Sequence, residues 1–431
     1  MWGCLALLLV GLHLIAGPKI TLSQWSVTPD ANAALEEALQ WKKGTMALSR
    51  SYSEMVVHNG TRYNIVGPGF VFVSLIGSML TGWTGGSPDT FYPPYYVAMV
   101  ALPIPFVAYW AFRSVLKSRK TGLGTSRLAW AAVLSAYLIV GTSLLPVLAI
   151  CKDGSIYYIN HALAVVGLLV FAVELLGRRR IWLAALGLCL AVWCRQMTCL
   201  YAIPLLWIAW RGHPRDTATV AQAAGSPTQN NLGQPTASSS TRRRKPRRDV
   251  PIAAACVAVI AAVPMTLNAL KFGNPFDTGY TRMYQSHSGP IAQRARQQFF
   301  GPTYVKMHAA AMNTNFPIWE LRGGTLYPVT VDIEGTSIWL TSPLLLGVFV
   351  TCRSWWRDRS RRVLMLSTLP VIAGLMCYHT TGAGGAGYYR YSLDFIPIWL
   401  LVIAPCTTGR RGVPLTLACL AYSALYFNLL P

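Results

Sequence analysis

The chain has 431 residues, of which 53% are hydrophobic and 12% are charged, and its mean hydropathy is +0.39. Because soluble domains carry about 25% charged residues, this composition excludes an ordinary soluble enzyme and indicates a chain that lies mostly in lipid. The formal net charge is +22, but the basic residues form short runs beside apolar segments, which favours membrane topology over nucleic-acid binding.

Apolar segments recur along the whole chain. A helix needs about 20 apolar residues to cross a bilayer, and we expect eleven segments to cross, although several are short. In chain order they are residues 2–16, 95–116, 128–150, 158–176, 181–194, 198–210, 250–270, 337–352, 363–378, 393–404 and 413–429. Gly69–Thr81 is also apolar and is predicted to be a re-entrant or interfacial helix. The expected fold is therefore an all-α polytopic membrane protein with about 11 transmembrane helices.

The charges are sorted by side. The segments expected in the cytosol, together with Arg113, hold 23 of the 37 basic residues and only 3 of the 15 acids. These segments are residues 117–127, 178–180, 211–249, 353–362 and 410–411. Basic residues mark the cytosolic side, so the N-terminus is expected inside and the C-terminus outside.

This scheme divides the chain into two membrane halves, residues 1–210 and 250–431. Residues 211–249 are rich in Ser, Thr, Gln and Ala and end in a basic run, and they are predicted to be a disordered cytosolic linker. The two large outer loops are expected at residues 18–68 and 271–336.

The first outer loop contains the sequence Thr28-Pro29-Asp30, followed by a predicted amphipathic helix over residues 32–43. A carboxylate at the membrane surface can accept a proton from an incoming hydroxyl, which makes Asp30 a candidate general base. The alternative is that Asp30 caps the next helix. Glu36 and Glu37 are interpreted as solvent-exposed positions on that helix.

Glycine and aromatic residues gather at the predicted outer ends of three later segments, residues 272–280, 335–343 and 384–394. In the last of them a glycine run precedes Arg390, an arrangement suited to holding a phosphate between backbone N–H groups and a guanidinium. The alternative is that Arg390 forms an i,i+4 salt bridge with Asp394.

Taken in order, these pieces resemble the GT-C superfamily of membrane glycosyltransferases, in particular the protein O-mannosyltransferase and aminoarabinose-transferase-like branch. The matching pieces are residues 28–30, 59–69, 141–142, the turn around 160–161, 272–280, 335–343 and 390–394. There are departures from the pattern: Gly67 stands where relatives usually have proline, and Ala31 stands where a second acid is frequent. The resemblance implies a GT-C-like fold.

The resemblance also implies a reaction. A sugar would be transferred, with inversion, from a polyprenyl-phosphate donor to a hydroxyl of an acceptor protein, lipid or glycan, with Asp30 as the base. The arginines that would hold the donor phosphate are Arg390 first, then Arg282, Arg62 and Arg195. Candidate contacts to the acceptor or the sugar are Tyr63, His161, Tyr280 and Tyr389.

Several of these residues also have an alternative, purely structural interpretation. Arg195 is alternatively a membrane-surface anchor, and His161 an interfacial histidine bonded to a carbonyl. No metal or other cofactor and no nucleic acid is expected. A bacterial cytoplasmic membrane is the expected location, with the site facing the periplasm or exterior. The alternative functions are a transporter or flippase of lipid-linked sugars, and a non-catalytic GT-C-like subunit.

Overall fold

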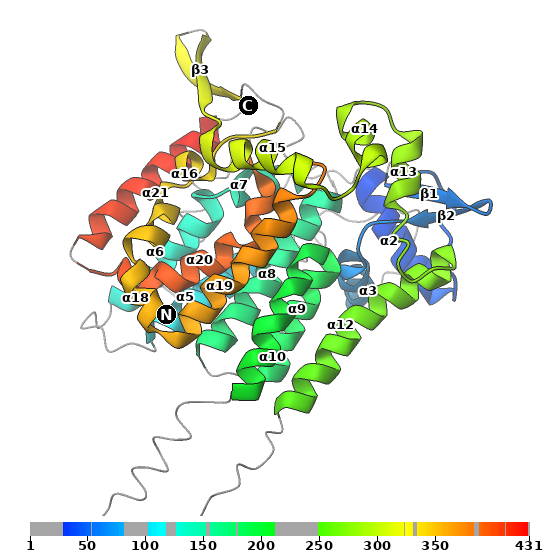
Figure 1. The fold of residues 1–431 in the computed structure, drawn as a ribbon, viewed down its shortest axis with the longest axis horizontal. Coiled ribbons are helices and arrows are strands. Elements are labelled where there is room, and N and C mark those ends of the chain that lie inside the picture. The colour runs from blue at the N-terminus through cyan, green and yellow to red at the C-terminus, as the bar shows by residue number, and fades with distance from the viewer. Residues whose placement is uncertain are drawn as a thin grey trace, which may run out of the picture.

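The computed structural model describes residues 29–52, 54–81, 102–117, 126–151, 156–177, 180–211, 249–322, 324–330, 334–382, 388–409 and 411–429. This part of the chain is mostly helical (Figure 1). The helices before the predicted linker are α2 (Pro29–Lys42), α3 (Gly69–Thr81), α5 (Pro103–Lys117), α6 (Ser126–Val140), α7 (Leu144–Cys151), α8 (Ile156–Leu176), α9 (Ile181–Cys194) and α10 (Ala202–Arg211). The 3-10 helix η3 (Gln196–Tyr201) joins α9 to α10.

The helices after the predicted linker are more often short and interrupted than those before it. They are α12 (Asp249–Phe272), α13 (Tyr280–Ser286), α14 (Pro290–Gln297), α15 (Val305–Ala309), α16 (Ile338–Thr341), α17 (Gly347–Val350), α18 (Cys352–Arg357), α19 (Arg359–Met376), α20 (Ile396–Ile403) and α21 (Gly412–Leu429). Short turns of helix lie between them: η4 (Pro302–Tyr304), η5 (Ala310–Thr314), η6 (Pro343–Leu346), η7 (Arg390–Asp394) and η8 (Ala404–Cys406).

Two antiparallel hairpins interrupt the helices, both in loops that the sequence predicts to lie outside. β1 (Met55–His58) pairs with β2 (Thr61–Asn64), and β3 (Pro317–Arg322) pairs with β4 (Thr325–Thr330). Asn59 and Gly60 join β1 to β2 with φ angles of 51° and 75°, the left-handed conformation that a two-residue hairpin turn requires. The all-α prediction is therefore wrong in these two loops, where local strand pairing satisfies the backbone.

α8 is the central helix of the body, and α5, α7, α9 and α20 pack around it. Apart from Asn160, His161 and Glu174, its sequence is apolar on every face, as expected for a helix surrounded by others. α8 and α9 approach closely where two glycines meet: a Cβ on Gly167 would lie only 2.5 Å from the carbonyl oxygen of Gly187. This close contact fixes the position of the carboxyl end of α9, where Arg195 follows.

The structure corrects the number of membrane spans. Within the described residues, only Tyr157–Leu176 of α8 and the whole of α12 are long and apolar enough to cross a membrane. α6 and α7 add a third only if they count as one span, and they are bent by 63°. The prediction of about eleven transmembrane helices in a GT-C-like fold is therefore wrong.

The physical reason is that polar residues, glycines and bends divide the apolar runs. α9, for example, has 14 residues and is about 21 Å long, whereas a hydrocarbon core is about 30 Å thick. Gly69–Thr81, predicted to be re-entrant or interfacial, is also a helix of only 13 residues. The predicted span at residues 2–16 and the linker core at 212–248 lie outside the described residues.

α12 is long but little covered by the rest of the molecule. Large apolar side chains lie on its surface, with Val259 53% and Leu270 63% exposed. Others are exposed on α9, α10, α19 and α21. Apolar surface of this extent marks contact with a membrane or with another protein.

The two ends of the helical body differ. α10 ends and α12 begins at one end, whereas α13, α14 and the β1–β2 hairpin gather at the other (Figure 1). The body thus separates the flanks of the predicted linker from both predicted outer loops.

The interpretation of Glu36 and Glu37 as solvent-exposed is wrong, because both are at most 2% exposed. Glu36 accepts hydrogen bonds of 2.5 Å from the backbone N–H of Ser49 and from the hydroxyl of Tyr52. Burial alone would raise the pKa of Glu36, but these hydrogen bonds outweigh it and hold the pKa below its ordinary value.

Glu37 ties the first outer loop to α12. Its carboxylate lies 2.5 Å from Nζ of Lys271 and accepts a 2.8 Å hydrogen bond from Nδ2 of Asn64. Lys271, itself only 7% exposed, also donates to the carbonyl oxygen of Asn64 at 2.9 Å. Because charged groups are costly to bury unpaired, this ion pair holds α2, β2 and the end of α12 in one arrangement.

Candidate functional site

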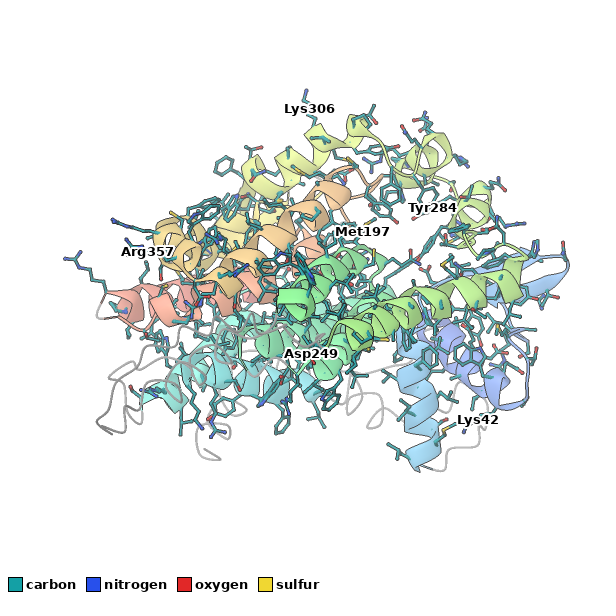
Figure 2. The ribbon with its side chains drawn as sticks, turned by 60° about the horizontal axis from the view of Figure 1, so that its bottom comes forward. Lys42, Met197, Asp249, Tyr284, Lys306 and Arg357 are labelled. Carbon is teal, nitrogen blue, oxygen red and sulfur yellow. The ribbon has the colours of Figure 1, made fainter. Side chains whose placement is uncertain are left out.

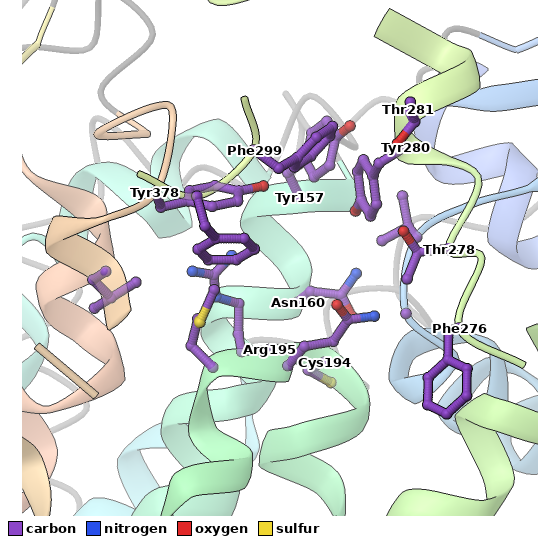
Figure 3. A pocket seen from close by; sticks show the side chains of 16 residues that line it. Tyr157, Asn160, Cys194, Arg195, Phe276, Thr278, Tyr280, Thr281, Phe299 and Tyr378 are labelled. Atoms are coloured by element: carbon purple, nitrogen blue, oxygen red, sulfur yellow. The ribbon is translucent and has the colours of Figure 1, made fainter. Parts of the chain in front are cut away.

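A cavity of about 290 Å³ lies between the start of α8, the break between α9 and η3, the segment that enters α13, and the end of α19 (Figure 3). Aromatic rings form much of its wall, and polar groups project between them. The lining residues are Val66, Gly67, Tyr157, Asn160, Cys194, Arg195, Gln196, Met197, Phe276, Thr278, Tyr280, Thr281, Phe299, Phe300, Leu375 and Tyr378.

The segment from residue 273 to 279 turns back onto the body and carries Tyr280 to the cavity. Gly279 has a φ of 77°, and a Cβ there would lie 2.7 Å from the side chain of Ile65 and 2.9 Å from the ring of Phe272. Only glycine fits this conformation and this contact without strain. The carboxylate of Asp277 closes the turn by accepting a 2.8 Å hydrogen bond from the N–H of Gly279.

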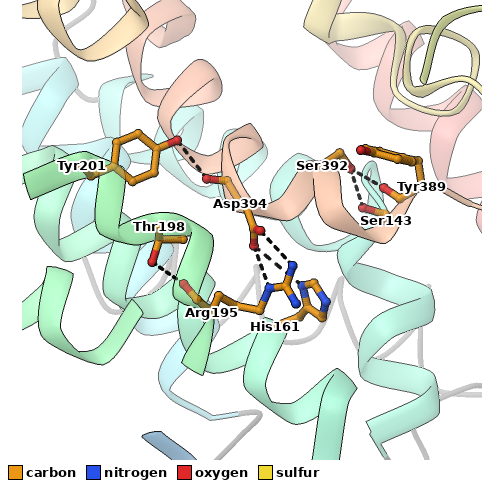
Figure 4. Close-up of polar contacts among 8 residues, drawn as sticks. All are labelled: Ser143, His161, Arg195, Thr198, Tyr201, Tyr389, Ser392 and Asp394. Atoms are coloured by element: carbon orange, nitrogen blue, oxygen red, sulfur yellow. Dashed lines mark hydrogen bonds and ion pairs between the residues drawn. The ribbon is translucent and has the colours of Figure 1, made fainter. Parts of the chain in front are cut away.

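Arg195 rises into the cavity from the extended residue that separates α9 from η3 (Figure 3). Its Nε and Nη2 atoms donate hydrogen bonds of 3.1 and 3.0 Å to the two carboxylate oxygens of Asp394 (Figure 4). Burial would lower the pKa of Arg195, but the charge of Asp394 outweighs it and raises the pKa above its ordinary value. The guanidinium is therefore a fixed positive charge.

Asp394 is itself held in place. The hydroxyl of Tyr201 donates a 2.9 Å hydrogen bond to its backbone carbonyl (Figure 4). Asp394 pairs with Arg195 and not with Arg390, so the i,i+4 salt bridge weighed as an alternative is wrong. Both residues lie in η7, a 3-10 helix with three residues per turn, in which i and i+4 side chains do not face each other.

Arg390 lies among tyrosines. Its guanidinium carbon is 4.5 Å from the ring centre of Tyr158, 5.5 Å from that of Tyr391 and 5.9 Å from that of Tyr157, within range of cation–π attraction. Within the described part of the chain, no carboxylate pairs with Arg390. The guanidinium carbon of Arg195 also lies near Tyr391, 4.5 Å from its ring centre, so two guanidiniums contact one tyrosine ring.

His161 lies behind the cavity. It is 1% exposed, stacks on Tyr391 at 5.6 Å, and places Nδ1 at 3.9 Å from a carboxylate oxygen of Asp394, too far for a hydrogen bond. Its neighbour Asn160 lines the cavity instead, because consecutive helix residues point about 100° apart. Of these two neighbours, Asn160 therefore lines the cavity and the predicted contact residue His161 does not.

Glu54 is a carboxylate near the cavity that the sequence analysis missed. It is 8% exposed, and it hydrogen-bonds to Tyr157, which lines the cavity. Burial raises the pKa of Tyr280, and the charge of Glu54 raises it further. No motif contains Glu54; its only signal in the sequence is that it is one of the few acids in the first outer loop.

The remaining predicted arginines lie away from the cavity wall. Arg282 donates to Asp277 at 2.8 Å and lies 2.8 Å from Nδ1 of His58. Arg62 is exposed on β2, where it lies 3.5 Å from the carbonyl oxygen of Ser49. Neither is a lining residue of the cavity.

The predicted tyrosines divide in the same way. Tyr280 lines the cavity, whereas Tyr63 packs edge-on against Phe272 at 5.8 Å. Tyr389 is 2% exposed, and its hydroxyl lies 2.9 Å from Nδ1 of His308. Asp30 falls in the first turn of α2, and its side chain lies outside the described residues.

Comparisons of the chain with protein-family models, with curated proteins and with solved structures find no match. The chemistry of the site therefore follows from its own groups. The Nη1 amino group of Arg195 has no acceptor among the described residues, so it can donate to a ligand in the cavity. Aromatic faces suit a sugar ring, and a guanidinium suits a phosphate or carboxylate oxygen.

Proposed function

We propose that the protein is a membrane glycosyltransferase that moves a sugar from a polyprenyl-phosphate donor to an acceptor hydroxyl. The ordered motifs that resemble the GT-C enzymes support this assignment, and kinship with that superfamily is part of the proposal. So is the location, a bacterial cytoplasmic membrane with the cavity facing the periplasm or exterior. The exposed apolar surface of α12 supports membrane insertion.

The observation that carries the proposal is a guanidinium beside the aromatic cavity that has no carboxylate partner in the described part of the chain. Arg195 pairs with Asp394, whereas Arg390, whose guanidinium carbon lies 5.9 Å from the ring centre of the cavity residue Tyr157, has no carboxylate partner among the described residues. A polyprenyl-phosphate sugar is a phosphodiester with one negative charge, which can pair with this guanidinium. At a separation of 4 Å and an effective dielectric of 20, two opposite unit charges attract by about 4 kcal/mol.

The position of the cavity also supports the proposal. Its walls come from the start of α8, the end of α9, the end of α19 and the segment after α12, all of which the charge sorting predicts to lie outside. Phe276, 78% exposed, lies at its rim beside the end of α12. A donor with its lipid tail along α12 would therefore bring its phosphate and sugar to the cavity.

In the proposed reaction the acceptor oxygen bonds to the anomeric carbon from the side opposite the phosphate. The bond from that carbon to the phosphate oxygen breaks, and its electron pair stays on the phosphate. Arg195 stabilises the growing charge. A carboxylate of the first outer loop takes the acceptor proton; the candidates are Asp30, from the sequence, and Glu54, from its contact with Tyr157.

The test uses the purified full chain in lipid nanodiscs with a panel of polyprenyl-phosphate hexoses and pentoses. We expect release of polyprenyl phosphate, and we expect Arg195→Gln to raise the KM for the donor about 10- to 100-fold, since a charged hydrogen bond contributes about 1.5–3 kcal/mol. Arg296→Gln is the matched control, because Arg296 is exposed and its hydrogen-bond acceptors among the described residues are only backbone carbonyls.

Three outcomes would reject the proposal. Failure to bind any lipid-linked sugar would exclude polyprenyl-phosphate sugars as the donor. Binding without transfer to any acceptor would favour the non-catalytic subunit. Movement of an intact donor across a liposome membrane without sugar transfer would favour the flippase.

A further inference from the structure

A basic and aromatic surface lies far from the cavity, at the end of the body where α10 ends. We call it the basic–aromatic ledge and define it by Trp207 of α10, Arg353, Trp356 and Arg357 of α18, and Arg359 and Arg362 of α19. Arg353, Arg357 and Arg359 are exposed, and Trp356 is 50% exposed. Arg357 projects from the surface in Figure 2.

Cation–π contacts hold the ledge together across three helices. The guanidinium carbon of Arg359 lies 4.8 Å from the ring centre of Trp207, which joins α19 to α10. That of Arg362 lies 5.5 Å from the ring centre of Trp356, which joins α19 to α18. These arginines stack on apolar rings and keep their N–H donors available, as amphipathic side chains do at a membrane surface.

The ledge keeps an excess of positive charge. Residues 353–362 contain five arginines and one acid, Asp358. Asp358 caps α19 by accepting from the N–H groups of Ser360 and Arg361, and it also lies 3.4 Å from Nε of Arg361, which is buried. Within the described residues, the four ledge arginines have no carboxylate partner.

An apolar stripe continues from the basic residues along the same face of α19. Leu366 and Leu369 follow Arg362 at i+4 and i+7, positions that share one helix face, and they are 40% and 56% exposed. Just before the ledge, Val350 of α17 is 82% exposed. The surface thus passes from cationic to apolar over about 10 Å of helix.

We propose that the ledge binds an anionic phospholipid, with the phosphate headgroup on Arg359 and Arg362 and an acyl chain along Leu366 and Leu369. A nucleic acid would supply phosphates but no group for the leucine stripe, so the continuous apolar face favours a lipid. The tryptophans match the boundary between headgroups and hydrocarbon, where this side chain is enriched. The inference does not depend on the cavity or on sugar transfer.

The test measures binding of dioleoyl phosphatidylglycerol and dioleoyl phosphatidylcholine to the purified full chain in detergent, by native mass spectrometry. We expect the wild type to prefer the anionic lipid at least tenfold. Each arginine near an anionic surface contributes about fivefold in affinity. The pair Arg359→Gln and Arg362→Gln should therefore weaken binding of the anionic lipid about 25-fold.

The matched control removes two charges at the other end of the body, with Arg296→Gln and Lys306→Gln, both of which are exposed. This pair should leave lipid affinity unchanged. Leu366→Ser should weaken binding of the dioleoyl lipid and leave the weak binding of free glycerol phosphate unchanged, because the headgroup alone has no acyl chain.

The inference is overturned if the wild type binds both lipids equally, a result that needs no variant and no assumption about folding. It is also overturned if both charge-removing pairs lower affinity alike, which would mean that only net charge matters. Competition by a single-stranded oligonucleotide at the same concentration as the lipid, with no effect of Leu366→Ser, would assign the ledge to nucleic acid instead.

Discussion

Replacing Asp394 with asparagine tests whether the guanidinium of Arg195, in the cavity wall, depends on the carboxylate of Asp394. Asparagine keeps the shape of the side chain but removes the charge that accepts both hydrogen bonds from Arg195. Arg195, with its side chain 18% exposed, would then remain next to Arg390 without a counter-ion. Breaking a buried ion pair in this way costs about 3–5 kcal/mol, and the partial exposure of Arg195 favours the lower end.

The assay is thermal unfolding of the purified chain, followed by intrinsic tryptophan fluorescence at fixed detergent and lipid. With an unfolding entropy of about 2.1 cal/mol/K per residue, a loss of about 3 kcal/mol lowers the Tm by roughly 3 °C for a chain of 431 residues. The double variant with Arg195→Gln should recover about half of this loss, because no unpaired charge remains.

Asp358→Asn is the matched control. Asp358 also accepts two hydrogen bonds, but from the backbone N–H groups that open α19, and loss of a helix cap costs about 1 kcal/mol. The reasoning is refuted if Asp394→Asn lowers the Tm no more than this control. It is also refuted if the double variant is less stable than Asp394→Asn alone, since the penalty would then not come from the unpaired guanidinium.

Three further predictions concern the folded state. Lys271→Met should lower the free energy of unfolding by about 3 kcal/mol, because it leaves the buried carboxylate of Glu37 without its ion-pair partner. Adding Glu37→Gln should restore part of the lost stability. Equal Tm values for the single and double variants would contradict this explanation. Burial lowers the pKa of His308 to about 4, below the ordinary value of about 6.5. Between these two pH values the unfolded chain binds more protons than the folded chain, so the free energy of unfolding should fall as the pH drops from 6.5 to 4. His308→Gln should flatten that part of the curve of Tm against pH, and an unchanged slope would exclude His308 as the cause. Gly167→Val should separate α8 from α9, because a Cβ meets the carbonyl oxygen of Gly187 at 2.5 Å; a wild-type Tm, measured in the same detergent, would show that the contact is not needed.

The position of the apolar helices could be read from the sequence, because it depends on local composition. Gly69–Thr81 and Ile181–Cys194 have the bounds expected from their apolar runs, and the helix expected over residues 32–43 is observed at Pro29–Lys42. The number of membrane crossings could not be read in this way. Composition reports how apolar a segment is, whereas its helical length depends on bends and breaks such as the 63° angle between α6 and α7.

The sequence by itself determined that Arg195, Arg390 and Tyr280 stand at segment ends of the same predicted side, because charge sorting and segment order need no tertiary contact. Only the tertiary structure decided which carboxylate serves which cation: Asp394 pairs with Arg195, 199 residues away, and not with Arg390 beside it in the chain. The same holds for Glu37, which pairs with Lys271 across the fold. A buried charge needs an opposite charge within a few ångströms, and the packing of helices far apart in the sequence determines which one it meets.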